Sequence, residues 1–260
     1  MKSLEESVTG SLDGSDTAIM KFLPWLLRDL WEIGSDPETM VRLITDHVRK
    51  DNLRILDLGC GKGAVSVRLA QEPGFTVTGI DAVPEFIMEA GEYARKFNVS
   101  DRCSFKVGDI RVRIRELSGF DVVILGAIGP VFGDLEVTLK TVRGAMTNPG
   151  YVLLDDGYIE DDLVTDYNRC LRKSEFFRQI SAGGFTVIKE EIFERNGLAE
   201  KDEAMFNSIK QRAEELMEQY PEKSELFRIY IENQNFETRM LETVITTGTW
   251  LLGTVCNPEK

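Results

Sequence analysis

The residues whose types and spacing could perform chemistry are three aspartates and one glycine-rich stretch. The run Asp57-Leu58-Gly59-Cys60-Gly61-Lys62-Gly63 places three glycines at alternate positions directly after an acid. Glycine permits backbone conformations that a side chain forbids, so the chain can reverse tightly and its N–H groups can approach a ligand at the mouth of the next helix. Asp81 and the triplet Gly108-Asp109-Ile110 each follow a further apolar run. Isolated acids after strands often cap helices, but three of them around one glycine loop favour a ligand site.

Two cofactors are compatible with the glycine stretch taken alone. Gly59, Gly61 and Ala64 fit the G-x-G-x-x-G/A fingerprint of dinucleotide-binding proteins. Asp81 at the end of the next predicted strand fits as well, because nicotinamide enzymes place an acid on the ribose there. A nicotinamide-dependent oxidoreductase is therefore one hypothesis.

The elements that position these residues are predicted by a regular alternation of strands and helices. Short apolar runs are separated by helical segments, a pattern typical of βαβ units and a parallel sheet. The predicted strands span 53–58, 75–81, 103–107, 120–125 and 151–155, and the helices between them span about 64–72, 84–98 and 134–146. After an irregular polar stretch, a helix at 174–182 leads to a strand at 185–194, two acidic helices at 199–220 and 222–236, and a final strand at 242–255.

The flanking regions suggest a division of the chain into parts. Residues 1–15 are polar and are expected to form a flexible tail. Residues 16–50 are expected to form two helices that cover a cleft, and 51–260 a cofactor-binding domain with a helical insertion at 197–240.

These motifs resemble class I S-adenosylmethionine (SAM) methyltransferases of the small-molecule type. The Asp57–Gly63 run resembles the family's D-x-G-x-G-x-G motif, and Gly108-Asp109-Ile110 its G-D-hydrophobic element after the third strand. Gly183-Gly184-Phe185 and the order of the last strands are also similar to the family. The resemblance implies an α/β, Rossmann-like sheet of seven mostly parallel strands with a reversed C-terminal hairpin. It also implies the cofactor SAM, with S-adenosylhomocysteine (SAH) as product.

The resemblance assigns roles to individual positions. Asp57 would order the amino end of SAM, Asp81 would hold the ribose hydroxyls, and Asp109 would accept from the adenine amino group. The full set of expected cofactor-binding residues is Asp57, Gly59, Cys60, Gly61, Asp81, Ala82, Gly108, Asp109, Ile110, Leu125 and Gly126.

Composition limits the partners. The formal net charge of -13 disfavours nucleic acid, whose binders usually carry a basic face. No apolar run is long enough to span a bilayer, so no membrane association is expected. The four scattered cysteines form no C-x-x-C pair and no metal spacing, which indicates reduced thiols in a cytoplasmic protein without a metal site.

The methyl acceptor is only weakly marked. Asp155, Asp156 and Tyr158, at or just past the end of the fifth predicted strand, are candidates for acid–base catalysis, with a solvated loop as the alternative. Trp25, Trp31, Tyr158 and Tyr230 are candidates for contact with a small-molecule substrate. The hypotheses are a small-molecule methyltransferase, an NAD-dependent oxidoreductase, or a SAM-binding protein without catalytic activity. The apolar N-terminal helix also allows a homodimer.

Overall fold

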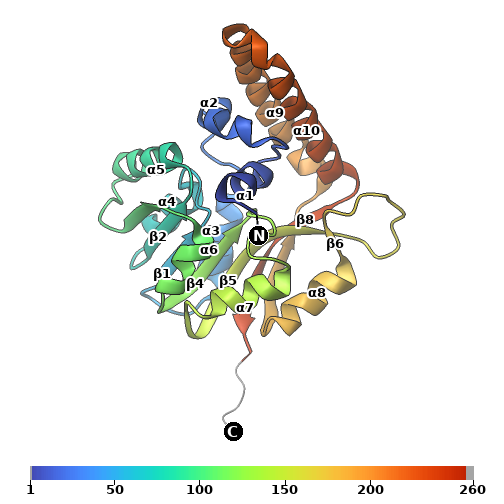
Figure 1. The fold of residues 1–260 in the computed structure, drawn as a ribbon. Helices are drawn as coiled ribbons and strands as arrows, with labels where there is room; N and C mark the ends of the chain where they lie inside the picture. The colour runs from blue at the N-terminus through green and yellow to red at the C-terminus, as the bar shows by residue number, and fades with distance from the viewer. Residues whose placement is uncertain (1, 256–260) are drawn as a thin grey trace.

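The computed structural model describes residues 2–255, with no side-chain description for 195–202. Helices flank a central sheet on both faces, and a helical layer lies above the carboxyl ends of its strands (Figure 1). The strands are β1 (Arg54–Leu58), β2 (Thr76–Asp81), β3 (Cys103–Val107), β4 (Phe120–Gly126), β5 (Met146–Ile159), β6 (Leu171–Arg172), β7 (Phe185–Ile192) and β8 (Thr246–Thr254). The helices that alternate with them are α3 (Pro37–His47), α4 (Ala64–Gln71), α5 (Pro84–Lys96), α6 (Ile110–Arg113), the 3₁₀ turn η2 (Ile114–Glu116), α7 (Leu135–Arg143) and α8 (Lys173–Ala182).

The sheet has the order β3-β2-β1-β4-β5-β8-β7, with the short β6 beside β5. Neighbouring strands from β3 to β5 are parallel. β8 is antiparallel to both β5 and β7, so the predicted reversal of the last strand is confirmed. The order reverses direction at β1, and the crevice outside the carboxyl ends of the strands at such a point is the usual ligand site of doubly wound sheets.

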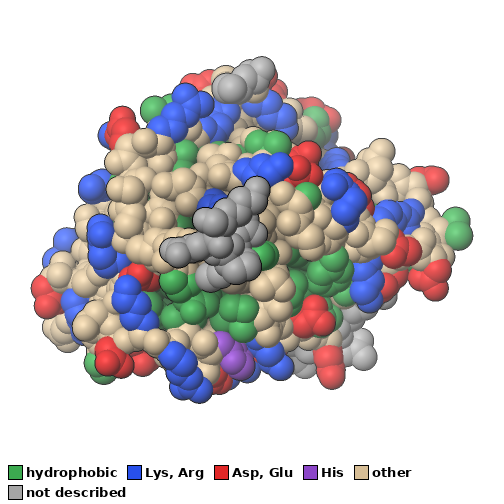
Figure 2. Space-filling model, turned by 90° about the horizontal axis from the view of Figure 1, so that it is seen from below, with side chains coloured by type: hydrophobic (Ala, Val, Ile, Leu, Met, Phe, Trp, Pro, Cys, Tyr) green, Lys and Arg blue, Asp and Glu red, His purple; other side chains and the backbone are tan. Residues whose placement is uncertain are grey.

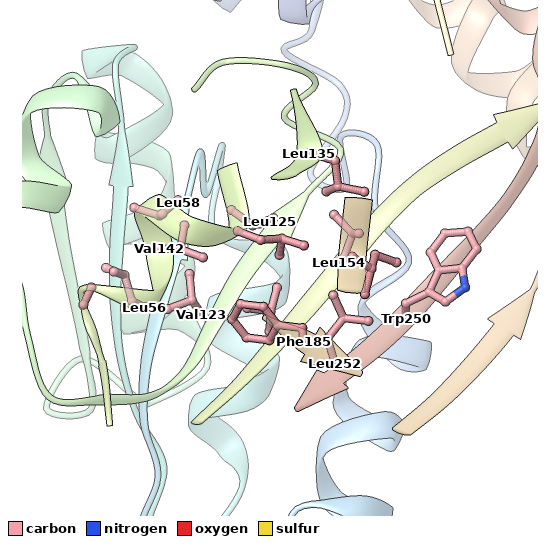
Figure 3. Close-up of a cluster of buried hydrophobic side chains, with 14 of the residues drawn as sticks. Leu56, Leu58, Val123, Leu125, Leu135, Val142, Leu154, Phe185, Trp250 and Leu252 are labelled. Atoms are coloured by element: carbon pink, nitrogen blue, oxygen red, sulfur yellow. The ribbon is translucent and has the colours of Figure 1, made fainter. Parts of the chain in front are cut away.

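Alternating side chains divide the core into two layers. Leu56, Leu125 and Leu154 point to the face covered by α7 and α8 (Figure 3). Ile55 and Ile124 point to the opposite face, which α3 and α4 cover. Both faces are apolar because helices bury the sheet on each side, which explains the nearly continuous apolar strands of the sequence.

The N-terminal region differs from expectation. Residues 1–15 were expected as a flexible tail, but Leu4–Ser11 form α1, whose start is closed by a reciprocal capping box between Ser3 and Glu6. The apolar segment that follows is not one continuous helix: it forms the 3₁₀ helix η1 (Thr17–Phe22) and the short α2 (Leu23–Leu26), with turns up to Gly34. Pro24 lies in the first turn of α2. A backbone N–H at that position has no acceptor within the helix, so the N–H that proline lacks is not needed there.

The predicted insertion is a helical hairpin of α9 (Arg195–Gln219) and α10 (Ser224–Thr243), joined by the turn η3 (Pro221–Lys223). A third apolar cluster ties this hairpin to the N-terminal region and to α5, with Leu23, Phe86, Ile209, Phe227 and Tyr230 among its buried members. Residues from the two ends of the chain therefore build one helical layer above the sheet (Figure 1).

Candidate active site

A cavity of about 380 Å³ lies between the carboxyl ends of the strands and the helical layer. Its floor comes from the ends of β1, β2 and β4 and the loops after them, and its roof from α1, the turns before Gly34, α9 and α10. The volume falls within the ~300–1,000 Å³ typical of small-molecule sites.

The glycine loop forms part of the floor. Gly59 and Cys60 both donate from their N–H groups to the carbonyl of Ile80, which holds the loop against the end of β2. Gly61 has φ +52°, and a Cβ built there meets no atom within 4 Å, so its backbone faces open cavity. Gly63 has φ +75°, but its Cβ would lie 2.9 Å from Ala90 and Phe105, so this glycine allows helix α4 to pack closely.

Asp57 lies beneath the loop. Its side chain is buried, and Ser66 donates a hydrogen bond of 2.6 Å to Oδ2. Burial raises the pKa of Asp57 to about 7, because the Ser66 bond only partly offsets desolvation and the charge of Asp81 adds to it. A cationic ligand group beside Asp57 would stabilise the ionised carboxylate.

Asp81 is held by the backbone. Its two carboxylate oxygens accept from the N–H groups of Gly61 and Val83, both at 2.9 Å. Burial raises its pKa, and these backbone bonds oppose the shift. Because each carboxylate oxygen has two lone pairs, Asp81 can accept further bonds from a ligand in the cavity.

Asp109 has a partner that the sequence did not suggest. The Arg111 guanidinium donates to both carboxylate oxygens, with its Nη2 2.8 Å from Oδ2, and the Arg111 N–H bonds Oδ1 at 2.9 Å. This arginine lowers the pKa of Asp109. Asp109 lines the cavity, yet most of its accepting capacity is used within the chain.

The structure brings nearly all the expected cofactor residues to the cavity wall. Those lining it are Asp57, Gly59, Cys60, Gly61, Asp81, Ala82, Gly108, Asp109, Ile110 and Gly126. Leu125 is the exception: it lies in the core cluster on the far side of β4 (Figure 3). Successive strand side chains point to opposite faces, so Ile124 and Gly126 line the cavity instead.

Two of the four expected substrate residues lie at the cavity. Trp31 lines it, with its ring stacked on Tyr93 at 4.3 Å and its Nε1 donating to the carbonyl of Lys62 at 3.1 Å. Tyr230 lines it from α10. Trp25 does not line the cavity; it is 40% exposed and packs against Arg28.

The expected acid–base residues lie away from the cavity wall. Tyr158 is buried among Phe176, Phe177 and Trp250, because β5 continues to Ile159 and carries this residue into the core. Asp156 lies on the same strand, where its Oδ1 accepts from the Gly157 N–H at 2.7 Å and burial raises its pKa to about 6. Asp155 lies behind Ser35, and burial raises its pKa to about 7, with the Ser35 hydroxyl partly offsetting the shift.

Sequence reasoning missed several polar residues on the wall, four of them with charged or amide side chains. Asp13, Gln234 and Glu237 come from the supposed tail and the insertion, and Lys62 from within the glycine motif. Lys62 is fully buried, and its Nζ donates to the carbonyl of Leu27 at 2.8 Å and pairs with Glu89 at 2.8 Å. The spacing of Tyr230, Gln234, Glu237 and Leu241 along one helix face is the one sequence signal that could have located this wall.

The fold and this cavity define the class I SAM methyltransferase architecture. A family model described as a methyltransferase domain matches residues 49–220. The chain therefore belongs to the methyltransferase domain family. Membership decides between the two cofactors in favour of SAM, and the interpretation as a nicotinamide enzyme is not supported.

Two curated relatives show the range of the likeness. The chain is 37% identical over 172 residues to a ubiquinone biosynthesis O-methyltransferase of Rickettsia canadensis, covering 58% of this chain and 70% of that protein. It is 25% identical over 152 residues to a sterol 24-C-methyltransferase of Debaryomyces hansenii, covering 56% of this chain and 38% of that enzyme. It also spans only 34% and 65% of two further ubiquinone O-methyltransferases, from Rickettsia akari and Rickettsia felis.

The fold is also shared with a solved SAM-dependent methyltransferase from Thiobacillus denitrificans in complex with SAH. The TM-score is 0.73 at 19% identity, over 90% of this chain and 98% of that one.

The cavity fits SAM by its own features. Open space lies against the Gly61 backbone, the buried Asp57 carboxylate suits an ammonium group, and Asp81 has lone pairs left for hydroxyls. Asp109 fits SAM less well, because both of its carboxylate oxygens already accept hydrogen bonds from Arg111.

Two surface observations bear on other partners. In the view from below, Lys and Arg side chains are scattered among acidic and apolar ones (Figure 2). Within residues 2–255, none of the helices has the length and apolarity needed to cross a membrane.

Proposed function

We propose that the protein transfers a methyl group from SAM to a small, largely apolar molecule. The observation that carries this proposal is one continuous cavity whose floor holds Asp57 and Asp81 and whose roof is mostly apolar, with Leu4, Val8 and Ile209 among its residues. A cavity of this size accommodates a small acceptor better than a polymer.

When bound, SAM supplies an electrophilic methyl group; the protein's part is to position both reactants and exclude water. Asp81, fixed by two backbone N–H groups, orients the ribose, and the open Gly61 backbone lets the cofactor approach the loop. Leu30 and Trp31 close the cavity from above.

The relatives support an acceptor with an apolar body. Their names refer to ubiquinone biosynthesis and to sterols, molecules with large hydrocarbon parts. The apolar roof is compatible with such an acceptor.

The proposal is tested by calorimetry with SAM and SAH. Both should bind, and Asp81→Ala should weaken SAM by about 1–3 kcal/mol, because a buried hydrogen-bonding group is lost. The control is Asp101→Ala, an exposed acid outside the cavity wall. A wild-type chain that binds neither compound contradicts the proposal; one that binds SAM but methylates nothing in a metabolite screen supports the alternative of a binding protein without catalysis.

Three further assignments belong to the proposal. Cys60, Cys103 and Cys170 are free thiols, which supports a cytoplasmic location. We keep a homodimer and the division into an N-terminal cover (16–50) and a SAM-binding domain (51–260) as proposals. Cys256 lies outside the described residues.

A further inference from the structure

The polar end of the cavity lies under the roof. Tyr230, Gln234 and Glu237 project from one face of α10, and Asp13 comes from the turn after α1. The roof around them is mostly apolar, so these side chains are the groups that could recognise a polar part of the acceptor.

Asp13 is held in place by α10. Gln234 donates to its Oδ2 at 2.9 Å, and Asn233 donates to its backbone carbonyl at 3.0 Å. Its backbone has φ +60°, a conformation that aspartate tolerates better than most residues. Among the side chains described, Oδ1 of Asp13 has no hydrogen-bond partner, so it can accept from a ligand.

Tyr230 provides the second group. Its side chain is 2% exposed, and its hydroxyl has no hydrogen-bond partner among the described residues. An unpaired buried hydroxyl destabilises the folded protein, so a ligand that bonds it is favoured. The negative charge of Asp13 acts on this hydroxyl and, together with burial, raises its pKa.

The Glu237 carboxylate already has partners within the protein. One of its oxygens accepts from the Tyr167 hydroxyl at 2.9 Å, and the other pairs with Arg169. Asp13 is therefore the acid left open at this end. One open carboxylate beside one unpaired hydroxyl suits a ligand that both donates and accepts.

Contacts link the polar end to the glycine loop on the floor of the cavity. The Ser11 hydroxyl, two residues before Asp13, donates to the carbonyl of Ile128 at 3.1 Å. Ile128 in turn contacts the glycine loop, because a Cβ built at Gly59 would lie 2.6 Å from it. This chain of contacts connects Asp13 to the floor that receives the cofactor.

We propose that Asp13 and Tyr230 form the acceptor site for a hydroxyl group, with Asp13 as general base, so that the enzyme is an O-methyltransferase acting on a phenol or alcohol with an apolar body. This rests on the proposed function. A hydroxyl donates to Asp13 and accepts from Tyr230, which satisfies both groups. An alkylamine is mostly protonated at neutral pH, and that ammonium form has only donors, so it would leave the Tyr230 proton without an acceptor.

The acceptor's O–H bond breaks and its proton passes to the Asp13 carboxylate; the oxygen's electron pair forms the new O–C bond. The C–S bond to the methyl group breaks and leaves its electrons on sulfur, which becomes a neutral thioether. Asp13 is half-buried, so it can release its proton to solvent afterwards.

The charges around Asp13 suit a base at neutral pH. Burial, followed by the charge of Glu237, raises its pKa to about 6, while Gln234 and Arg169 oppose the shift. Deprotonated Asp13 therefore predominates at pH 7. The rate should rise with pH to a plateau above about 6.

The test uses 4-octylphenol as the acceptor, with 4-octylbenzylamine as the matched amine. SAM binding is measured first by calorimetry, since failure there contradicts the proposed function and not this inference alone. The wild type should methylate the phenol. Asp13→Asn, which keeps the shape and the Gln234 bond, should lower kcat/KM by roughly 10²–10⁴-fold and abolish the rise in rate around pH 6.

Tyr230→Phe should raise KM for the phenol and weaken its calorimetric binding to the SAH complex, about tenfold. The matched controls are Asp166→Asn, in an exposed loop, and Tyr151→Phe, whose ring packs against the core cluster on the face that α3 and α4 cover. Both should behave as the wild type. Binding of SAM without transfer to the phenol, transfer to the amine alone, or an Asp13→Asn variant with an unchanged pH profile would each overturn the inference.

Discussion

Gly61 and Gly63 lie two residues apart in the same motif, but they have different physical roles. Position 63 requires glycine because a Cβ there would press on Phe105 and prevent the close packing of α4. Position 61 requires it because the space beside its backbone is cavity. Under the proposed function, only the second role concerns the cofactor.

The Gly61→Ala variant should therefore lose affinity for SAM at least tenfold, because its methyl group would project into the cavity. Left-handed backbone costs alanine about 1–2 kcal/mol, so stability also falls. Gly129→Ala controls for this cost, since Gly129 has φ +64°, free space around its Cβ and a position off the cavity wall. Calorimetry with SAH measures both variants; equal affinities would show that Gly61 does not face the cofactor.

At the scale of elements, hydrogen bonds and an ion pair fasten the N-terminal segment before Gly34 to the glycine loop and to α4. Lys62 reaches the carbonyl of Leu27, Trp31 donates to the carbonyl of Lys62, and Arg68 on α4 pairs with Glu32 at 2.6 Å. These contacts hold one side of the cavity roof directly on the glycine loop. The docking of the roof and the shape of the floor are therefore coupled.

Replacing Lys62 with methionine should loosen this segment. The carbonyl of Leu27 loses its donor and Glu89 loses its buried cation, at a cost of about 1–3 kcal/mol. Limited thermolysin digestion followed by intact mass should show faster cleavage before Gly34, and SAM affinity should fall. Lys140→Met is the matched control, because Lys140 is exposed on α7 and pairs along its own helix, with Glu136. Identical digestion of both variants would contradict the coupling.

The strands and helices of the βα core were predictable because their signals are local. Apolar runs ending in Asp57 and Asp81 mark β1 and β2, and Pro84 marks the start of α5. Residues 156–159 were misjudged as irregular, since pairing of β5 with β8 extends the strand through a polar sequence. Tertiary pairing here outweighs local preference.

At the scale of the whole molecule, burial of Asp57 beneath the glycine loop makes the free energy of unfolding depend on pH. Asp57 has a pKa of about 7 in the folded protein and an ordinary value, near 3.8, in the unfolded chain. Between these values the folded state holds a proton that the unfolded state has released. The contribution to stability is therefore full below the unfolded pKa and is lost as pH rises through about 7.

Comparison with Asp57→Asn isolates this effect from other titrating groups. The unfolding free energy of the wild type minus that of the variant should fall as pH rises from 5 to 8, by up to about 1.4 kcal/mol per pH unit below pH 7. Urea denaturation of the ligand-free proteins measures it. A difference that stays constant across this range would show that Asp57 is ionised in the folded protein.

The sequence by itself determined the sheet and the floor of the cavity, because strand ends, glycines and acids occur there within short, continuous stretches. Only the tertiary structure decided the roof, which joins Asp13 and α1 to Tyr230 and α10 across more than two hundred residues of chain. It also decided that Leu125 and Tyr158 face the core and that Arg111 occupies Asp109. Contacts between segments so far apart carry no local periodicity, so they become visible only when packing brings the two ends of the chain together.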